Sequence, residues 1–382
     1  MAASRNLSGG CLMTVWTTLF PFSVWECWWL VPTALIMDAL LGDPPLPWRH
    51  PVCFVGGLLQ RLESPARRLA SRMPLLSPQA ALRVAGMLAV LLLVLVTGLV
   101  VRLSLAAVAF LPGDFPQFLM ALYWAWAGLA LGSLVRTGAT VRFRVENFPL
   151  PAAREALSWL VSRDTSVMDR PLMRKTLADT LSENFTDAGI APLFWLLVGG
   201  PVALWCYKAV STTDSMWGYL TPRWRWLGWA GARGDDLLAF LPARLGAVLL
   251  YLTDICARAA ARILPFGAAT LRPWDGRWPG LSRIRRDAAG MPSPNSGWSM
   301  AACAWLCRAR QGGPSVYFGE LVHKEWLGPP EAEAAPWDES RLTVLNRLLL
   351  RGMLAGGLIL WAAALLARGL FFPSSSIFLF PF

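Results

Sequence analysis

Residues 84–111 read VAGMLAVLLLVLVTGLVVRLSLAAVAFL, and Arg102 is the only charged side chain among them. This run exceeds the roughly 20 apolar residues that a helix needs to cross a bilayer core of about 30 Å. A second apolar run extends from about Phe118 to Val135, after the turn-forming segment Pro112-Gly113-Asp114. The two runs predict an antiparallel pair of membrane-spanning helices.

The composition of the whole chain agrees with this interpretation. Hydrophobic residues make up 55% of the 382 residues, which include 21 Trp, and the mean hydropathy is +0.45. We therefore predict an all-α polytopic membrane protein with about four to six transmembrane or re-entrant helices, plus cytoplasmic and interfacial amphipathic helices. A net charge of +11 would suit a nucleic-acid-binding protein, but the Arg residues flank apolar segments, as in membrane proteins. The predicted partner is a lipid bilayer and not a nucleic acid.

Apolar runs and breaks divide the chain. We expect an N-terminal extension over residues 1–26, one membrane domain over 27–372 and a C-terminal tail over 373–382, with helical cytoplasmic segments at about 136–187 and 254–351. The membrane domain should begin with a short span, Cys27–Leu41, and end with an apolar helix, Met353–Phe372. Between them, Gly56–Arg72 has the pattern of an amphipathic helix at the membrane surface.

Residues 188–207 are long enough to span, but Pro192 and Gly199-Gly200-Pro201 interrupt them. Such a segment is either a straight span or a broken, re-entrant element. A straight span would place Asp187 and Asp214 on opposite sides of the membrane, whereas a re-entrant course would return them to one side.

Acidic residues cluster at the borders of the apolar segments. Lys175, Asp179, Glu183 and Asp187 recur every four residues and would share one helical face. Carboxylates at this spacing repel one another, and Mg²⁺ held with substrate phosphates would relieve the repulsion. The alternative is a solvated face with a Lys175–Asp179 pair.

Two further charged stretches follow along the chain. A basic, aromatic loop from Thr221 to Trp229 suits the membrane interface. Asp235-Asp236 then precede a predicted helix from Leu237 to Leu252, and Asp236 and Arg244 are expected on one face.

Two loops resemble ligand-binding loops by composition. Asn295 or Ser296 would cap the Ala-rich helix that follows, and the free N–H groups at its start attract phosphate; capping alone is a sufficient explanation. Gly312-Gly313 would permit close approach of the backbone to a ligand.

The residue inventory excludes several kinds of site. The seven Cys are scattered without a Cys-x-x-Cys pair, which argues against zinc and against a disulfide framework. Because the chain has only two His, we do not expect a multi-histidine metal site or a Ser-His-Asp triad. His50 is interpreted as a loop residue. No zinc and no haem are expected, and the Gly-x-x-x-x-Gly-Lys-Ser/Thr phosphate loop is absent.

Taken together and in order, the polar motifs resemble the adenosylcobinamide-phosphate synthases of cobalamin biosynthesis, the CbiB/CobD family. The resemblance covers about residues 27–370. The matching motifs are Asp38…Gly42-Asp43-Pro44, His50-Pro51-Val52 with Gly56, Ser182-Glu183-Asn184…Asp187…Ala191-Pro192-Leu193-Phe194, Tyr207-Lys208-Ala209…Thr212…Asp214-Ser215-Met216…Gly218-Tyr219, Arg233…Asp235-Asp236…Pro242-Ala243-Arg244, Arg286-Asp287-Ala288, Ser293-Pro294-Asn295…Gly297-Trp298 and Gly312-Gly313-Pro314…Tyr317…Gly319-Glu320. Ala188 and Ser211 depart from the family, which usually has Gly and often Asn there.

The resemblance implies an amide-forming ligase in the inner (cytoplasmic) membrane of a bacterium. It would join the free propionate of adenosylcobyric acid, a corrinoid, to (R)-1-amino-2-propanol or its O-phosphate, with Mg²⁺ and with ATP as cosubstrate. An acyl phosphate would activate the carboxylate. The active site would face the cytoplasm. Other late cobalamin-pathway membrane enzymes, or further copies of the chain in a homo-oligomer, are partners that the resemblance leaves open.

The family motifs and the charges at apolar borders together suggest roles for individual residues. The catalytic candidates are Asp187, Asp214 and Lys208, and the metal candidates are Asp187, Asp214, Asp235, Asp236 and Glu183. The substrate-binding candidates are Asn184, Ser215, Arg233, Arg244, Arg286, Asn295, Gly312 and Gly313. Arg suits this task because it can contact phosphate or carboxylate with two hydrogen bonds.

Two other functions compete with a ligase. A non-catalytic regulatory membrane protein of the AmpE-like kind would share the topology, but the retained acidic motifs favour the enzyme. Broken helices that carry acids are also typical of transporters. No inverted repeat supports that alternative.

Overall fold

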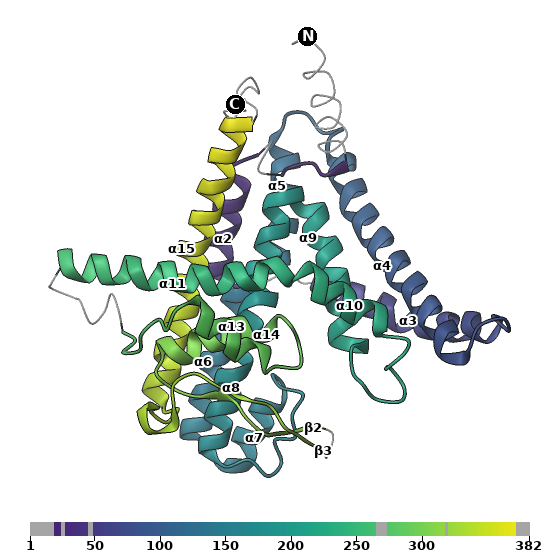
Figure 1. Cartoon of the computed structure of the whole chain (residues 1–382). Helices are drawn as coiled ribbons and strands as arrows, with labels where there is room; N and C mark the ends of the chain where they lie inside the picture. Colours follow the sequence, from purple (N-terminus) through teal and green to yellow (C-terminus); the bar gives the residue numbers. More distant parts are fainter. Residues whose placement is uncertain (1–18, 24–26, 45–48, 265–272, 318–319, 372–382) are drawn as a thin grey trace, which may run out of the picture. The chain divides into compact units, whose positions relative to one another are not determined.

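A computed structural model describes residues 19–23, 27–44, 49–264, 273–317 and 320–371 (Figure 1). The extension (1–26) and the tail (373–382) lie mostly or wholly outside these residues. The described chain forms two compact units. The single membrane domain stays a prediction.

The first unit contains residues 1–129, 192–238 and 358–382. Its helices are α2 (Leu30–Leu41), α3 (Pro51–Ser71), α4 (Pro78–Val108), α5 (Phe115–Gly128), nearly all of α9 (Ala191–Trp217), α10 (Trp229–Leu238) and the end of α15 (Glu339–Phe371).

The second unit contains residues 130–191 and 239–357. Its helices are α6 (Leu131–Asn147), α7 (Leu150–Ser158), α8 (Arg170–Phe185), the π-helix η1 (Thr186–Ile190), α11 (Phe240–Ile263), α13 (Leu281–Ala289), α14 (Ser296–Leu306), the 3-10 helix η2 (Glu331–Glu333) and the first part of α15. Its strands form two antiparallel pairs, β1 (Gln311–Gly312) with β4 (Trp326–Leu327) and β2 (Ser315–Tyr317) with β3 (Glu320–Val322).

The predicted fold class is confirmed. Among the described residues, five helical segments are long and apolar enough to cross a membrane: Pro78–Val108, Phe115–Asn147, Arg170–Trp217, Phe240–Ile263 and Glu339–Arg368. The chain is thus a multi-pass membrane protein. The expected first span is not among them, because α2 has 12 residues and reaches only about 18 Å.

Helix α4 shows how the sequence builds a membrane-facing element. Ser77 accepts a hydrogen bond from the Ala80 backbone at 3.3 Å, and Pro78 occupies the first turn. Small residues such as Ala85 and Ala89 are buried, whereas Leu91 and Leu95 remain 52% and 60% exposed. An exposed row of leucines is costly in water and favourable against lipid.

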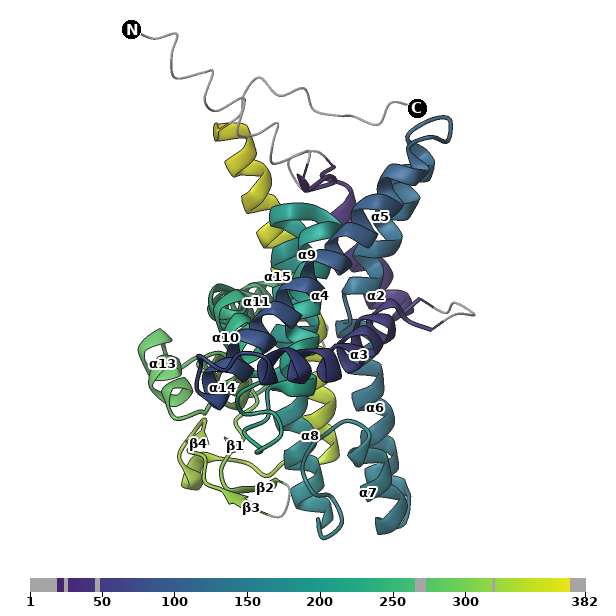
Figure 2. The same ribbon diagram turned by 90° about the vertical axis from the view of Figure 1, so that its right-hand side faces the viewer.

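The first unit contains the expected amphipathic helix and a helical hairpin, but the second expected span is interrupted, because α5 ends at Gly128 and α6 begins at Leu131 in the second unit. α4 and α5 are adjacent and joined by a short turn. The amphipathic helix α3 starts at Pro51, somewhat earlier than predicted, and lies beside the first turns of α4 (Figure 2).

Helix α9 is broken at two glycines. Gly199 (φ −140°, ψ 26°) and Gly200 (φ 62°, ψ −162°) leave helical geometry, and the positive φ favours a residue without a Cβ. The short helix α10 contacts both arms. Trp195 donates from Nε1 to the Leu238 carbonyl at 3.3 Å, and Val210 lies against Gly234.

These contacts indicate that α9 folds back. In a straight helix Trp195 and Val210 would lie about 22 Å apart, whereas their partners Gly234 and Leu238 are about 6 Å apart along α10. Of the two alternatives for residues 188–207, the structure therefore favours the re-entrant one. A straight span would have forced the ends of this segment onto opposite sides of a membrane, and the fold-back removes that constraint.

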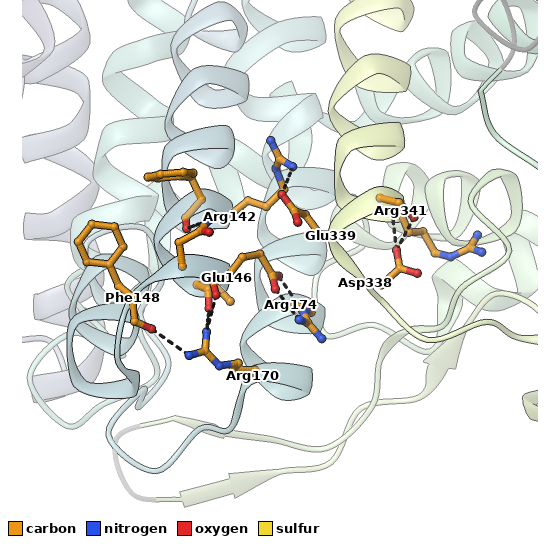
Figure 3. A network of polar contacts seen from close by, with 12 residues as sticks. Arg142, Glu146, Phe148, Arg170, Arg174, Asp338, Glu339 and Arg341 are labelled. Atoms are coloured by element: carbon orange, nitrogen blue, oxygen red, sulfur yellow. Dashed lines mark hydrogen bonds and ion pairs between the residues drawn. The ribbon is translucent and has the colours of Figure 1, made fainter.

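Ion pairs on the second unit join α6, α8 and α15 (Figure 3). Arg174 on α8 donates from Nε to Glu146 Oε1 on α6 at 2.7 Å, and Arg142 Nη1 reaches Glu339 Oε1 on α15 at 3.0 Å. Arg170 binds the chain end of α6 through the Phe148 carbonyl at 3.0 Å. The predicted segment 136–187 is mostly helical, in α6, α7, α8 and the start of η1, with a non-helical stretch at 159–169.

Candidate functional site

The charged face of α8 is buried instead of solvated. Asp179 has no exposed surface, and its Oδ2 accepts from Lys175 Nζ at 2.9 Å and from Arg163 Nη1 at 2.8 Å. The predicted Lys175–Asp179 pair is correct, but the solvated face is wrong, because Arg163 from the preceding loop covers it. A carboxylate with two cations satisfies the requirement that buried charges be paired.

The glycine loop of residues 312–313 docks on this ion triad. The Gly312 backbone N–H donates to Asp179 Oδ1 at 3.1 Å, and Lys175 Nζ donates to the Gly312 carbonyl. Next to it, Gln311 donates to Ser182 Oγ on α8 at 2.8 Å. Asp179 thus holds two cations and one backbone amide, and it fixes the loop on α8.

Both loop glycines are required by the fold itself. Gly312 and Gly313 have φ of +74° and +69°, and a Cβ would overlap the Glu325 carbonyl at Gly312 and the Trp326 ring at Gly313. The sequence suggested close approach to a ligand, and the close approach that is observed is to the protein itself. Its observed partners are β4 and the residue before it.

The other predicted residues of α8 lie one turn further along. Glu183 and Asn184 are half-buried, and Asn184 donates from Nδ2 to the Thr180 carbonyl at 2.9 Å. Asp187 is half-buried in the π-helix η1. A π-turn shifts the following side chains around the axis and is frequent at functional sites.

Arg244 and Asn295 meet, although they were predicted separately. Arg244 Nη1 donates to Asn295 Oδ1 at 3.0 Å, and its guanidinium lies over the rings of Phe240 and Trp298 at 3.4 Å and 4.9 Å. Asn295 precedes α14 but makes no side-chain cap. The capping interpretation of Asn295 is therefore wrong, because Arg244 takes the oxygen that a cap would use.

Arg286 is exposed on α13 and pairs with no acidic side chain among the described residues. In this motif it is the neighbouring residue, Asp287, whose side chain is held by hydrogen bonds. Asp287 accepts from Arg283 Nε at 2.9 Å, from Trp305 Nε1 at 2.9 Å and from the Gly328 N–H at 3.3 Å. A side chain with three such donors has a structural role in holding α13 to α14.

The first unit carries the second group of predicted residues on α9. Lys208 and Asp214 are half-buried and Ser215 is exposed, with its hydroxyl donating to the Ser211 carbonyl at 3.0 Å. Gly218 lies so close to Asp214 that a Cβ would overlap Oδ1. The glycine of this motif therefore leaves room for the carboxylate.

Asp235 and Asp236 do not precede their helix but lie inside α10. Arg233 Nη1 pairs with Asp236 Oδ2 at 3.1 Å, with Arg233 67% exposed. The predicted shared face of Asp236 and Arg244 is wrong. The helix ends at Leu238 and a new one, α11, starts at Phe240, so the two side chains stand on different helices.

His50 is not only a loop residue, because its side chain caps the helix that follows. Its Nδ1 accepts from the Val52 N–H at 3.3 Å and caps α3. Burial lowers the pKa of His50; the charge of Asp43 opposes this shift and the charge of Lys208 adds to it. His50 therefore lies within electrostatic reach of two residues of the predicted motifs.

The candidate residues thus fall into two groups, each within one unit. Glu183, Asn184, Asp187, Arg244, Asn295, Gly312 and Gly313 belong to the second unit with Arg286, and Lys208, Asp214, Ser215, Arg233, Asp235 and Asp236 belong to the first. In the described parts of the chain, no three His, Cys, Asp or Glu side chains are grouped so as to hold a metal ion.

The sequence interpretation missed Arg163 and Gln311. Arg163 stands in an unremarkable loop, and nothing in its neighbourhood marks it. Gln311 directly precedes Gly312-Gly313, and that adjacency was the one available signal.

Comparisons with known proteins agree with the motifs. The family model described as CobD/Cbib protein matches residues 31–346. A "Cobalamin biosynthesis protein CobD" of Photorhabdus laumondii is 35% identical over 335 residues, covering 85% of this chain and 97% of that protein. Proteins of the same name from Rhodobacter capsulatus and Geobacter metallireducens are 33% and 38% identical, covering 88% and 81% of this chain and 98% and 89% of their own lengths.

No solved structure matches the chain. The family match covers most of the chain and includes every predicted site residue. The chain belongs to the CobD/Cbib protein family.

Proposed function

We propose that the chain is an enzyme of cobalamin biosynthesis, an amide-forming ligase of the bacterial inner membrane. It joins the free propionate of adenosylcobyric acid to (R)-1-amino-2-propanol or its O-phosphate and yields adenosylcobinamide or its phosphate. The observation that carries the proposal is the family match over residues 31–346, which spans all the acidic and basic motifs. The Arg-rich flanks of the spans favour an active site on the cytoplasmic side.

A carboxylate needs activation before an amine can displace its oxygen. In the proposed reaction the propionate oxygen attacks the γ-phosphorus of ATP, ADP leaves, and an acyl phosphate forms. The amine nitrogen then attacks the acyl carbon, the phosphate leaves with the bonding electrons, and a base takes the proton from nitrogen.

Each unit supplies residues suited to these steps. We assign the proton transfer to Asp187 or Asp214 and the orientation of phosphate to Lys208. Arg244 is suited to bind an anion because Phe240 and Trp298 hold its guanidinium plane. Asn184 and Asn295 have amide groups that match the amides of a corrinoid.

The donor set fits Mg²⁺ better than a metal that needs a protein cage. Mg²⁺ is commonly held by one or two carboxylates together with substrate phosphates and water. Asp187 with Glu183, or Asp214 with either Asp235 or Asp236, would hold it. When bound, the ion neutralises phosphate charge.

The test is a mass-spectrometric assay on the detergent-purified protein. It contains adenosylcobyric acid, ATP, Mg²⁺ and either aminopropanol or its phosphate. We expect a corrinoid product that is heavier by the amide-linked amino alcohol, lost on chelation with EDTA and restored by excess Mg²⁺. Corrinoid turnover that persists after chelation contradicts the Mg²⁺ assignment, and the lack of both product and corrinoid binding favours the AmpE-like alternative.

A further inference from the structure

The first unit has an open depression of about 480 Å³ on the polar side of α3. Arginine, hydroxyl and amide side chains line it, with a single carboxylate. The lining residues are Gln60, Glu63, Ser64, Arg67, Arg68, Ser71 and Arg223.

The depression is held in shape by a three-residue cluster. Glu63 accepts from Arg67 Nε at 3.0 Å and from Arg223 Nε and Nη2 at 3.1 Å and 2.7 Å. Arg67 also donates from Nη2 to the Arg223 carbonyl at 2.7 Å. The hydrogen bond from Arg223 is the main cause of the lowered pKa of Glu63.

The lining carries more positive than negative charge. Arg67 and Arg223 share the single carboxylate of Glu63, and Arg68 makes no ion pair or side-chain hydrogen bond among the described residues. The helix dipole stabilises a cation in the last turn of a helix. This explains the position of Arg68 but not that of the other arginines in the lining. Arg223 is brought here from 160 residues further along the chain.

The loop that supplies Arg223 packs near the start of a membrane-spanning helix. Leu227 lies against Gly86 in α4 so closely that a Cβ on Gly86 would overlap the Leu227 carbonyl. Arg83 in α4 stacks over Trp226 and Trp229 at 4.6 Å and 5.4 Å. Paired Arg and Trp side chains at the end of a span are typical of the bilayer interface, where lipid phosphates lie.

We propose that this depression binds the headgroup of an anionic phospholipid. The phosphate accepts from Arg68 and from the outer N–H groups of Arg67 and Arg223, and Arg is suited to such contacts by its planar fork. Ser64 and Gln60 make no side-chain hydrogen bond among the described residues and match the hydroxyls of a glycerol headgroup. The site lies outside the proposed catalytic residues and does not depend on them.

The direct test is native mass spectrometry of the full-length protein in detergent after removal of lipid. Dioctanoylphosphatidylglycerol and dioctanoylphosphatidylcholine are titrated in parallel. We expect the anionic lipid to bind at least about tenfold more tightly, and Arg68→Gln to lose about tenfold, the effect of one charge-assisted hydrogen bond. Arg68→Gln leaves the Glu63–Arg67–Arg223 cluster intact.

Arg72→Gln is the matched control. It removes the same charge from the end of the same helix, but Arg72 does not line the depression. We expect less than about a twofold change. Equal losses in the two variants would overturn the proposal, because they would show non-specific attraction to a basic surface.

Two measurements on the wild-type protein need no variant. Preference for the anionic lipid should fall as salt rises from 50 to 500 mM, because partly exposed charges are screened, and lack of any preference at low salt contradicts the proposal. Inorganic phosphate at 5 mM should leave the lipid bound. Complete displacement would overturn the proposal and identify a site for free phosphate.

Discussion

Arg163 Nη1 lies 2.8 Å from Asp179 Oδ2, and the two side chains are only 5% and 0% exposed. Because Lys175 reaches the same oxygen at 2.9 Å, one carboxylate pairs with two cations inside the second unit. The triad also holds the Gly312 amide. Two of the charged residues on α8 that suggest a ligand site in the sequence, Lys175 and Asp179, are thus already bound by other residues of the protein.

Asp179→Ala should lower the free energy of unfolding by about 3–5 kcal/mol, because it removes the buried carboxylate that both Arg163 and Lys175 contact. Thermal unfolding in detergent measures the loss. Arg233→Ala is the control, since it breaks an ion pair whose Arg is 67% exposed and should cost less than about 1 kcal/mol. Similar losses for the two variants would mean that the triad is not buried.

The loop next to the triad should be equally sensitive. Gly313→Ala adds a Cβ at φ +69° that overlaps the Trp326 ring, and strain with overlap should cost about 2 kcal/mol or more. Gly113→Ala separates backbone strain from steric overlap, because Gly113 has φ +80° but no atom within 4 Å of the added Cβ. Equal destabilisation by the two variants would show that the overlap is relieved at no cost.

Asp187→Asn or Asp214→Asn, whichever removes the general base, should lower kcat by about 100-fold or more, the usual contribution of such a group. Both substitutions keep the size of the side chain, so insertion and thermal unfolding should match the wild-type protein. Asp114→Asn in the exposed turn before α5 is the control and should retain full activity. Near-wild-type turnover by both site variants contradicts the assignment.

His50 should make the stability of the protein depend on pH. Burial lowers its pKa from 6.5, so below this value the unfolded chain takes up a proton that the folded chain does not, and stability falls as pH falls. His50→Asn keeps a side-chain acceptor at the start of α3 and does not titrate. The melting temperature of this variant should change less between about pH 7 and pH 5 than that of the wild-type protein; an unchanged slope contradicts the prediction.

The sequence predicted the fold class and indicated a break in α9 as one of two alternatives, because both depend on local signals. Run length and hydropathy identify spans, and Gly199-Gly200-Pro201 marked the break in α9. The boundary between α10 and α11 was misplaced because no glycine or proline stands at Ala239. Pro242 falls in the first turn of α11, where proline is tolerated.

The site was harder to predict because its contacts join distant residues. Arg244 and Asn295 were each identified by their motifs, but nothing local shows that they bond across 51 residues. Arg163 carries no motif at all, although it decides that Asp179 is buried. Local patterns identify which residues are polar in an apolar context, and only packing shows which of them neutralise one another.

The glycine break in α9 also constrains how the protein is made. The arm after Gly200 has 17 residues, fewer than the roughly 20 apolar residues that a helix needs to cross a bilayer core. The second arm packs on helices synthesised earlier, with Leu204 against Gly128 and Trp205 bonded to the Trp124 carbonyl at 2.8 Å. We therefore expect stable insertion of this arm to depend on α5, which the ribosome makes first, so that the order of synthesis favours the order of packing.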